Sequence, residues 1–168
     1  MEGFSNLIEF AIALAGFTSI VVVFAHKDEK WKPLDKFRIT NALMGSVGAA
    51  FLAATPYGLL YVGLSDQLIW QVEGLLVGSY ILLLLISVLT RRNKNLPKDV
   101  RQQLPRKLVA TIIILGLIYA LLIFTSLIGV VGWSIKGLGY FGIIYLLLIS
   151  MFAFFRLLFY RPIDDQSE

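Results

Sequence analysis

Five apolar segments, each long enough to cross a membrane, follow one another along this chain. They cover residues 5–25, 39–62, 70–90, 108–131 and 137–157. A helix needs about 20 mostly apolar residues to cross the hydrocarbon core of a bilayer, and each segment reaches that length. Backbone polar groups in lipid must be hydrogen-bonded within the spanning structure, and a helix does this within one segment. The sequence therefore predicts an all-α membrane protein, a bundle of five transmembrane helices.

The composition agrees with a membrane protein. Of the 168 residues, 58% are hydrophobic and 15% are charged, whereas soluble domains carry roughly 25% charged residues. The five segments take up most of the chain, so we expect residues 1–168 to form a single membrane-embedded helical domain. The absence of cysteine excludes disulfides, thiolate metal sites and cysteine nucleophiles.

Small side chains are concentrated in the second and third segments. Eight of the fourteen residues 41–54 are Gly, Ala or Ser. Small residues let membrane helices approach closely, which is the main source of attraction between helices in lipid. We therefore predict that helix packing depends on the row Gly45, Ala49 and Ala53, with Ser46, Ala50 and Ala54 beside it, and on the Gly74-x-x-x-Gly78 pattern.

The basic residues predict an orientation. Fourteen of the fifteen Lys and Arg residues lie on one side of the predicted bundle, and only Lys136 lies on the other. Positive residues in short loops mark the cytoplasmic face. We expect the N-terminus outside, the C-terminus in the cytoplasm, and a multi-pass location in the cell inner (plasma) membrane.

The basic loops 26–38 and 91–107 have two possible partners. A basic segment can bind RNA or anionic lipid headgroups. The loop 91–107 has no interleaved aromatic residues on which bases could stack, so lipid is favoured. We therefore expect contact with the bilayer and with anionic headgroups, and no nucleic-acid partner.

The residues of known catalytic motifs are missing. The chain has one His and no Cys, and it contains neither a Walker loop nor a G-x-S-x-G elbow. We therefore expect no catalytic residues, no cofactor, no metal site and no enzymatic activity.

Glu9 and Glu73 are the only acidic residues inside the predicted spans. Counted from Ser5 and Trp70, they lie about 6 Å and 5 Å from the outer boundary at 1.5 Å per residue. Two carboxyl groups in one partly desolvated site can share a proton or hold a cation. We therefore expect an external polar site of Glu9 and Glu73, in which Lys136 could neutralise one of them. The alternative is that each carboxyl group turns toward water independently.

Three stretches resemble a group of small, uncharacterised bacterial integral membrane proteins. They are Ala15-Gly16-Phe17-Thr18-Ser19-Ile20-Val21, the residues Trp31 to Arg38, and Phe155-Arg156-Leu157-Leu158. The resemblance extends to the order of the helices along most of the chain. It implies a membrane-embedded fold, and it implies no activity and no functional residue.

Two functions fit these patterns. The first is a non-enzymatic interaction or assembly component, whose small-residue surfaces would accept a second copy of the chain or another membrane protein. The second is a small oligomeric channel or an ion- or proton-coupled transporter with Glu9 and Glu73 at its external mouth. A membrane-embedded enzyme ranks third, since no nucleophile has a neighbouring base.

Overall fold

The computed structural model describes residues 2–25, 32–98, 100, 104 and 106–159, and it places five helices among them. All five are long and apolar enough to cross a membrane, which confirms the predicted number and type of elements. They are α1 (Glu2–Ala25), α2 (Pro33–Tyr61), α3 (Asp66–Asn95), α5 (Arg106–Leu127) and α6 (Ile135–Phe159).

All five helices begin before the predicted apolar segments, because hydropathy marks only the part of a helix that lies in hydrocarbon. Helix α2 begins at Pro33, a residue that favours the first turn, and it continues through Pro56 to Tyr61. Helix α3 likewise continues past its apolar part to Asn95. Helix α5 ends at Leu127, earlier than the predicted residue 131.

The early end of α5 has a local cause. The N–H groups of Val130 and Val131 both bond to the carbonyl oxygen of Thr125, which turns the chain back on the last helical turn. Gly129 takes the positive φ of +76° that such a turn requires. The hydroxyl of Ser126 then donates a 2.7 Å hydrogen bond to the carbonyl oxygen of Trp133 and fixes the connection to α6.

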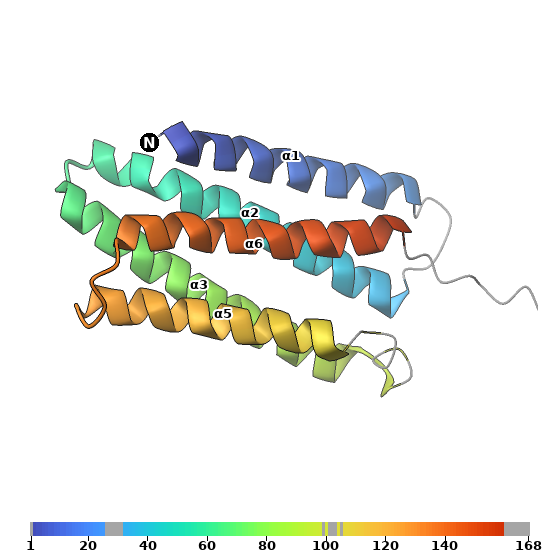
Figure 1. Cartoon of the computed structure of the whole chain (residues 1–168). Helices are drawn as coiled ribbons and strands as arrows, with labels where there is room; N and C mark the ends of the chain where they lie inside the picture. Colours follow the sequence, from blue (N-terminus) through green and yellow to red (C-terminus); the bar gives the residue numbers. More distant parts are fainter. Residues whose placement is uncertain (1, 26–31, 99, 101–103, 105, 160–168) are drawn as a thin grey trace, which may run out of the picture.

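The bundle has three central helices and two outer ones. Helix α6 packs most extensively on α2 and also contacts α3, while α1 packs on α2 and α5 packs on α3 (Figure 1). Helices α1 and α5 lie on opposite flanks in this view, and they bury the smallest share of their apolar windows. Their exposed sides carry large apolar side chains, which suits contact with lipid.

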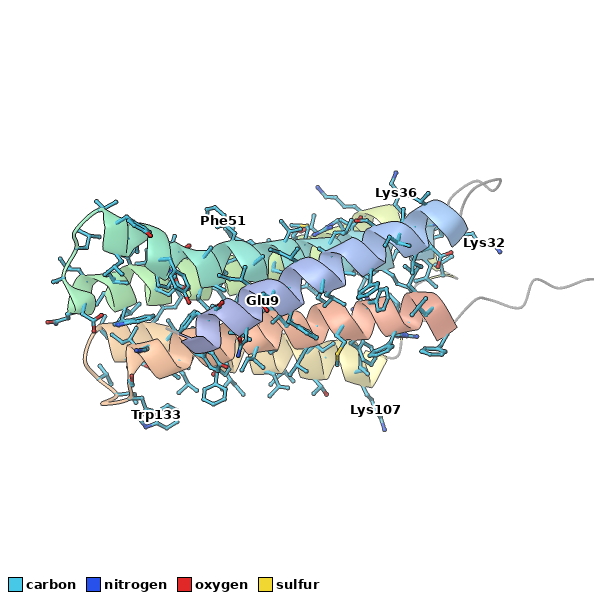
Figure 2. The ribbon with its side chains drawn as sticks, turned by 90° about the horizontal axis from the view of Figure 1, so that it is seen from above. Glu9, Lys32, Lys36, Phe51, Lys107 and Trp133 are labelled. Carbon is cyan, nitrogen blue, oxygen red and sulfur yellow. The ribbon has the colours of Figure 1, made fainter. Side chains whose placement is uncertain are left out.

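The two ends of the bundle differ in charge. Lys32, Lys36 and Lys107 lie toward one end and Trp133 lies at the other (Figure 2). The first of these, called the basic end below, is where α2 and α5 begin and α3 and α6 finish. The opposite end, called the Lys136 end, contains the α2–α3 turn and the start of α6.

The predicted small residues lie at contacts between these helices. A Cβ atom on Gly45 would lie 3.2 Å from the carbonyl oxygen of Leu146 on α6, so the backbones of α2 and α6 approach closely there. Ala49 and Ala53 on the same helix are fully buried. In the second row Ser46 is buried, Ala50 is partly buried and Ala54 is exposed.

The two glycines of α3 face other helices. A Cβ atom on Gly78 would lie 3.2 Å from the ring of Phe124 on α5. A Cβ atom on Gly74 would lie 2.7 Å from a methyl group of Ile135, the first residue of α6. Most of these small residues of α2 and α3 are therefore covered by helices of the same chain, whereas Ala54 is exposed.

Candidate functional site

A cavity of about 90 Å³ lies near the basic end, between α2, α3, α5 and α6. Its walls are mostly apolar and include Leu84 and Leu85 of α3, Ile112 of α5 and Ile149 of α6. Leu104, from the connection between α3 and α5, also lines it. Every helix except α1 therefore contributes side chains to this space.

Leu104 is held in place by a small apolar cluster. Its side chain is buried against Leu34 of α2 and Leu96, and Val109 of α5 packs on the same cluster. Leu96 and Leu104 thereby anchor the α3–α5 connection to the basic end of the bundle.

Three arginines and one asparagine supply the polar part of the cavity lining. They are Arg38 and Asn41 of α2, Arg92 of α3 and Arg156 of α6. Arg38 is only 5% exposed and Asn41 only 7%. Each side chain comes from within a few turns of the helix terminus at the basic end, because α2 begins there and α3 and α6 finish there.

Part of this cationic group is balanced by the chain itself. Arg38 Nη1 donates to Asp35 Oδ1 at 3.4 Å, one turn earlier on α2. The guanidinium carbon of Arg156 lies 5.9 Å from the centroid of the Phe152 ring, which gives it a cation–π contact. Three of the four polar side chains that line the cavity carry a positive charge.

The acceptor Asn41 Oδ1 and the donor Arg92 Nε are buried and lack hydrogen-bond partners among the described residues. A buried unsatisfied donor or acceptor costs about 1–3 kcal/mol. A bound molecule that accepts from Arg92 and donates to Asn41 would satisfy both atoms.

The neighbouring Arg91 has a different role. Its Nη2 donates to Ser87 Oγ at 2.6 Å and lies 2.8 Å from the sulfur of Met44. Its Nε donates to the carbonyl oxygen of Ser87 at 3.3 Å. Arg91 therefore joins α3 to α2 and does not line the cavity.

At the Lys136 end, a cation rests on an aromatic cluster. The ammonium nitrogen of Lys136 lies 4.7 Å from the centroid of the Trp70 ring. The ring of Phe4 lies 5.4 Å from that of Trp70 and 5.3 Å from that of Tyr140. The cluster thus joins the first turns of α1, α3 and α6.

The structure gives Glu9 and Glu73 different surroundings. Glu9 is exposed on α1 (Figure 2), whereas Glu73 on α3 is fully buried. Neither carboxyl oxygen of Glu73 has a hydrogen-bond partner among the described residues, so no carboxyl–carboxyl hydrogen bond joins the two acids. Lys136, the third residue expected in this polar site, contacts Trp70, which lies three residues before Glu73 on α3.

The sequence-based prediction missed the arginine-lined cavity. Arg38, Arg92 and Arg156 were counted only as part of the basic side of the bundle, and the structure places all three in the lining of one cavity. A signal was present, because all three arginines lie within two turns of a helix end at the basic end, Arg38 near the start of α2 and the other two near the ends of α3 and α6. Which of the basic residues face inward depends on helix rotation, and the charge pattern alone does not give that.

Comparison with known proteins finds no match: no family model, no curated protein and no solved structure is similar to this chain. Function is therefore argued from the geometry.

Proposed function

We propose that this chain is a non-enzymatic membrane protein that binds one anionic phospholipid, whose phosphate group enters the cavity at the basic end. One observation supports this above all. Arg38, Arg92 and Arg156 line a cavity whose remaining walls are apolar and lie between membrane-spanning helices. Such a lining matches a molecule with an anionic head and a hydrocarbon chain.

The arginines suit a phosphate group in particular. A guanidinium group presents planar donors that match phosphate oxygens, and charge-assisted hydrogen bonds of this kind are stronger than neutral ones. The free donor Arg92 Nε would bond a phosphate oxygen. The free acceptor Asn41 Oδ1 requires a donor, which a headgroup hydroxyl would supply. The ligand class is therefore an anionic phospholipid with a hydroxylated headgroup, such as phosphatidylglycerol.

The charge distribution supports a cytoplasmic position for this cavity. Fourteen of the fifteen basic residues belong to the side of the chain where the cavity lies, and such residues mark the cytoplasmic face. The N-terminus would then lie outside and the cavity at the inner leaflet of the plasma membrane. Lys27, Lys30, Arg101 and Arg161 fall outside the described residues and contribute to this argument by sequence alone.

A role as an interaction or assembly component is the alternative. It was expected from the small-residue faces of the second and third spans, and much of these faces packs on α3, α5 and α6 of the same chain. A lipid-binding role instead uses side chains whose polar atoms remain unsatisfied within the described residues.

Native mass spectrometry of the purified protein tests the proposal. The protein is equilibrated with equal amounts of phosphatidylglycerol and phosphatidylcholine, and we expect one retained phosphatidylglycerol per chain. Arg92→Gln removes a cavity guanidinium group and should reduce retention about tenfold, since a hydrogen bond to a charged group contributes about 1.5–3 kcal/mol. Lys94→Gln is the matched control, because Lys94 is exposed on the same helix end and does not line the cavity.

A second experiment tests whether the headgroup binds without its hydrocarbon chain. Glycerol phosphate carries the same anionic group without a hydrocarbon chain, and at millimolar concentration it should not displace the lipid. Equal retention of the two lipids, or equal loss in Arg92→Gln and Lys94→Gln, would contradict a specific site in the cavity.

A further inference from the structure

The cavity at the basic end is too small for the hydrocarbon chains of a phospholipid. It measures about 90 Å³, whereas an apolar cavity of about 150 Å³ holds a single benzene molecule. A phosphate group fits such a space, but the acyl chains must lie outside it. A lipid bound there therefore needs an opening through which its head and its chains stay connected.

The exposed part of the cavity lining belongs to α5 and α6. Among the described lining residues, those that are buried all come from α2, α3 or the connection after α3; they are Arg38, Asn41, Leu84, Leu85 and Leu104. Every lining residue of α5 and α6 is at least partly exposed. Phe152 of α6 is 36% exposed, the largest value in the described lining. The cavity therefore reaches the surface of the bundle between α5 and α6.

Tyr145 holds α5 and α6 together near the middle of the membrane. Its hydroxyl donates a 2.6 Å hydrogen bond to the backbone carbonyl oxygen of Ile112 on α5. A Cβ atom on Gly116 would lie 2.5 Å from the same hydroxyl oxygen, and the ring of Tyr119 stacks on that of Tyr145. The opening is therefore bounded by this contact on the side of the membrane centre.

From Tyr145 toward the basic end, the same face of α6 lines the cavity. Ile149, Phe152 and Arg156 follow Tyr145 at spacings of four, three and four residues, which places them on one side of a helix. All three line the cavity. The two helices thus touch at Tyr145, and the cavity lies between them beyond that point.

The side chains at this opening match the junction between a lipid head and its chains. The guanidinium carbon of Arg156 lies 5.9 Å from the centroid of the Phe152 ring, so a cation is held at the opening. Leu148, one turn before Phe152, is 54% exposed and offers an apolar surface outside it. Phe152 lies about two turns before the end of α6 at Phe159, roughly 10 Å at 1.5 Å per residue. This depth falls within one leaflet, whose hydrocarbon is roughly 15 Å thick.

We propose that the opening between α5 and α6 is the lateral entry of the anionic phospholipid. The phosphate group passes Phe152 and Arg156 into the cavity, and the acyl chains stay in the bilayer against Leu148 and Phe152. The inference rests on the function proposed above and adds to it the route of the lipid and the place of its chains. The lipid then exchanges directly with the leaflet at the basic end.

A photoreactive phosphatidylglycerol tests this entry in the wild-type protein. The probe carries a diazirine in the middle of one acyl chain, and a phosphatidylcholine probe carries the same group. Each is added in trace amount to the full-length protein in phosphatidylcholine nanodiscs, and crosslinked peptides are identified by mass spectrometry. We expect the phosphatidylglycerol probe to label residues 108–115 and 148–155 in excess over the phosphatidylcholine probe, and both probes to label α1 equally. Unlabelled phosphatidylglycerol should abolish the excess.

The labelling pattern separates the entry from the proposed function. An excess confined to α1, or to α2 and α3, would overturn the entry between α5 and α6 and leave selective lipid binding in place. Equal labelling of every helix by the two probes would contradict the proposed function, and the entry would fall with it.

Substitutions of Phe152 test the same opening through the rate of lipid exchange. Native mass spectrometry follows the replacement of bound phosphatidylglycerol by an excess of its deuterated form. Phe152→Ala removes the ring that holds Arg156 at the opening, so release should be about threefold faster, the factor that corresponds to one exposed cation–π contact. Phe152→Trp keeps that contact and narrows the opening, so its release should be slower than that of the wild type.

Phe155→Ala and Phe155→Trp are the matched controls for these rates. Phe155 is exposed on the same helix and does not line the cavity, so both variants should release the lipid at the wild-type rate. Equal rates for the Phe152 and Phe155 variants, in a protein that still retains phosphatidylglycerol, would overturn the lateral entry.

Discussion

The hydroxyl of Tyr80 on α3 donates a 2.6 Å hydrogen bond to the backbone carbonyl oxygen of Met44 on α2. The ring lies against Gly48 on its way to that oxygen, since a Cβ atom on Gly48 would lie 2.2 Å from Tyr80 Cζ and from its hydroxyl oxygen. Gly48 is four residues after Met44, one turn further along the helix. The glycine therefore gives a side chain of one membrane helix access to the backbone of another.

Gly48→Ala should destabilise the protein because the added methyl group occupies the position of the Tyr80 ring. Overpacking of this kind typically costs about 1–3 kcal/mol, and displacement of the ring also breaks the bond to Met44. Thermal unfolding in detergent should show a lower Tm. The control is Gly58→Ala on the same helix, where nothing lies within 4 Å of the added atom. Equal Tm values for the two variants would mean that Tyr80 relaxes at no cost.

The contact between Gly142 of α6 and Val77 of α3 gives a second prediction. Gly142→Ala alone introduces a contact of 2.6 Å with Val77 Cγ1, and Val77→Ala alone removes buried methyl groups from the core. In the double variant the new methyl group fills part of the space that Val77 leaves. We expect the double variant to lose about 0.5–3 kcal/mol less unfolding free energy than the two single variants lose together. Strict additivity of the unfolding free energies would show that the two residues do not meet.

The helices could be predicted from the sequence, because the length and the apolar composition of each segment indicate a membrane-spanning helix. The ends of the helices were predicted less accurately. Residues 91–95 were expected in a loop, yet α3 continues through them, because polar residues beyond the hydrocarbon region do not prevent a helix from continuing. Helix α5 ends at Leu127 because the chain turns at Gly129. The residues that follow Leu127 are mostly apolar, so hydropathy did not indicate this end.

The candidate sites were harder to predict because they depend on helix rotation. Glu73 was expected at a shallow depth, about 5 Å from the outer boundary when counted from Trp70, although α3 begins four residues earlier, at Asp66. The side chain is nevertheless buried, because it faces Gly139 of α6 and not the surface. Asn41 lies on α2 and Arg92 lies near the far end of α3, so they are distant in the sequence. Only the packing of α2 on α3 brings them to one cavity.

The orientation of the bundle is a third prediction. Ser65 lies in the turn between α2 and α3, and Lys98 lies in the connection at the opposite end; both are exposed. The chain has no native cysteine, so Ser65→Cys and Lys98→Cys each provide a single reactive thiol. With the basic end in the cytoplasm, a membrane-impermeant maleimide added to intact cells should label Ser65→Cys and should label Lys98→Cys only after permeabilisation. The reverse pattern would invert the orientation and place the arginine-lined cavity at the outer leaflet.

The contact between α2 and α6 gives the last prediction. The hydroxyl of Ser150 on α6 donates to the carbonyl oxygen of Ala42 on α2, which also accepts a 2.8 Å bond from Ser46 Oγ. Ser150→Ala removes the interhelical bond and leaves that carbonyl oxygen with its bond from Ser46. The cost should therefore be small, about 0.6 kcal/mol, the average for side-chain hydrogen bonds between membrane helices.

Ser150→Val adds bulk where Gly45 already lies close to Ser150, with 3.0 Å from a Cβ on Gly45 to Ser150 Cβ. It should cost about 1–3 kcal/mol as an overpacked contact. Unfolding of both variants under the same conditions separates the two effects, and a larger loss for Ser150→Ala than for Ser150→Val would show that the hydrogen bond, and not the close approach, holds α2 to α6.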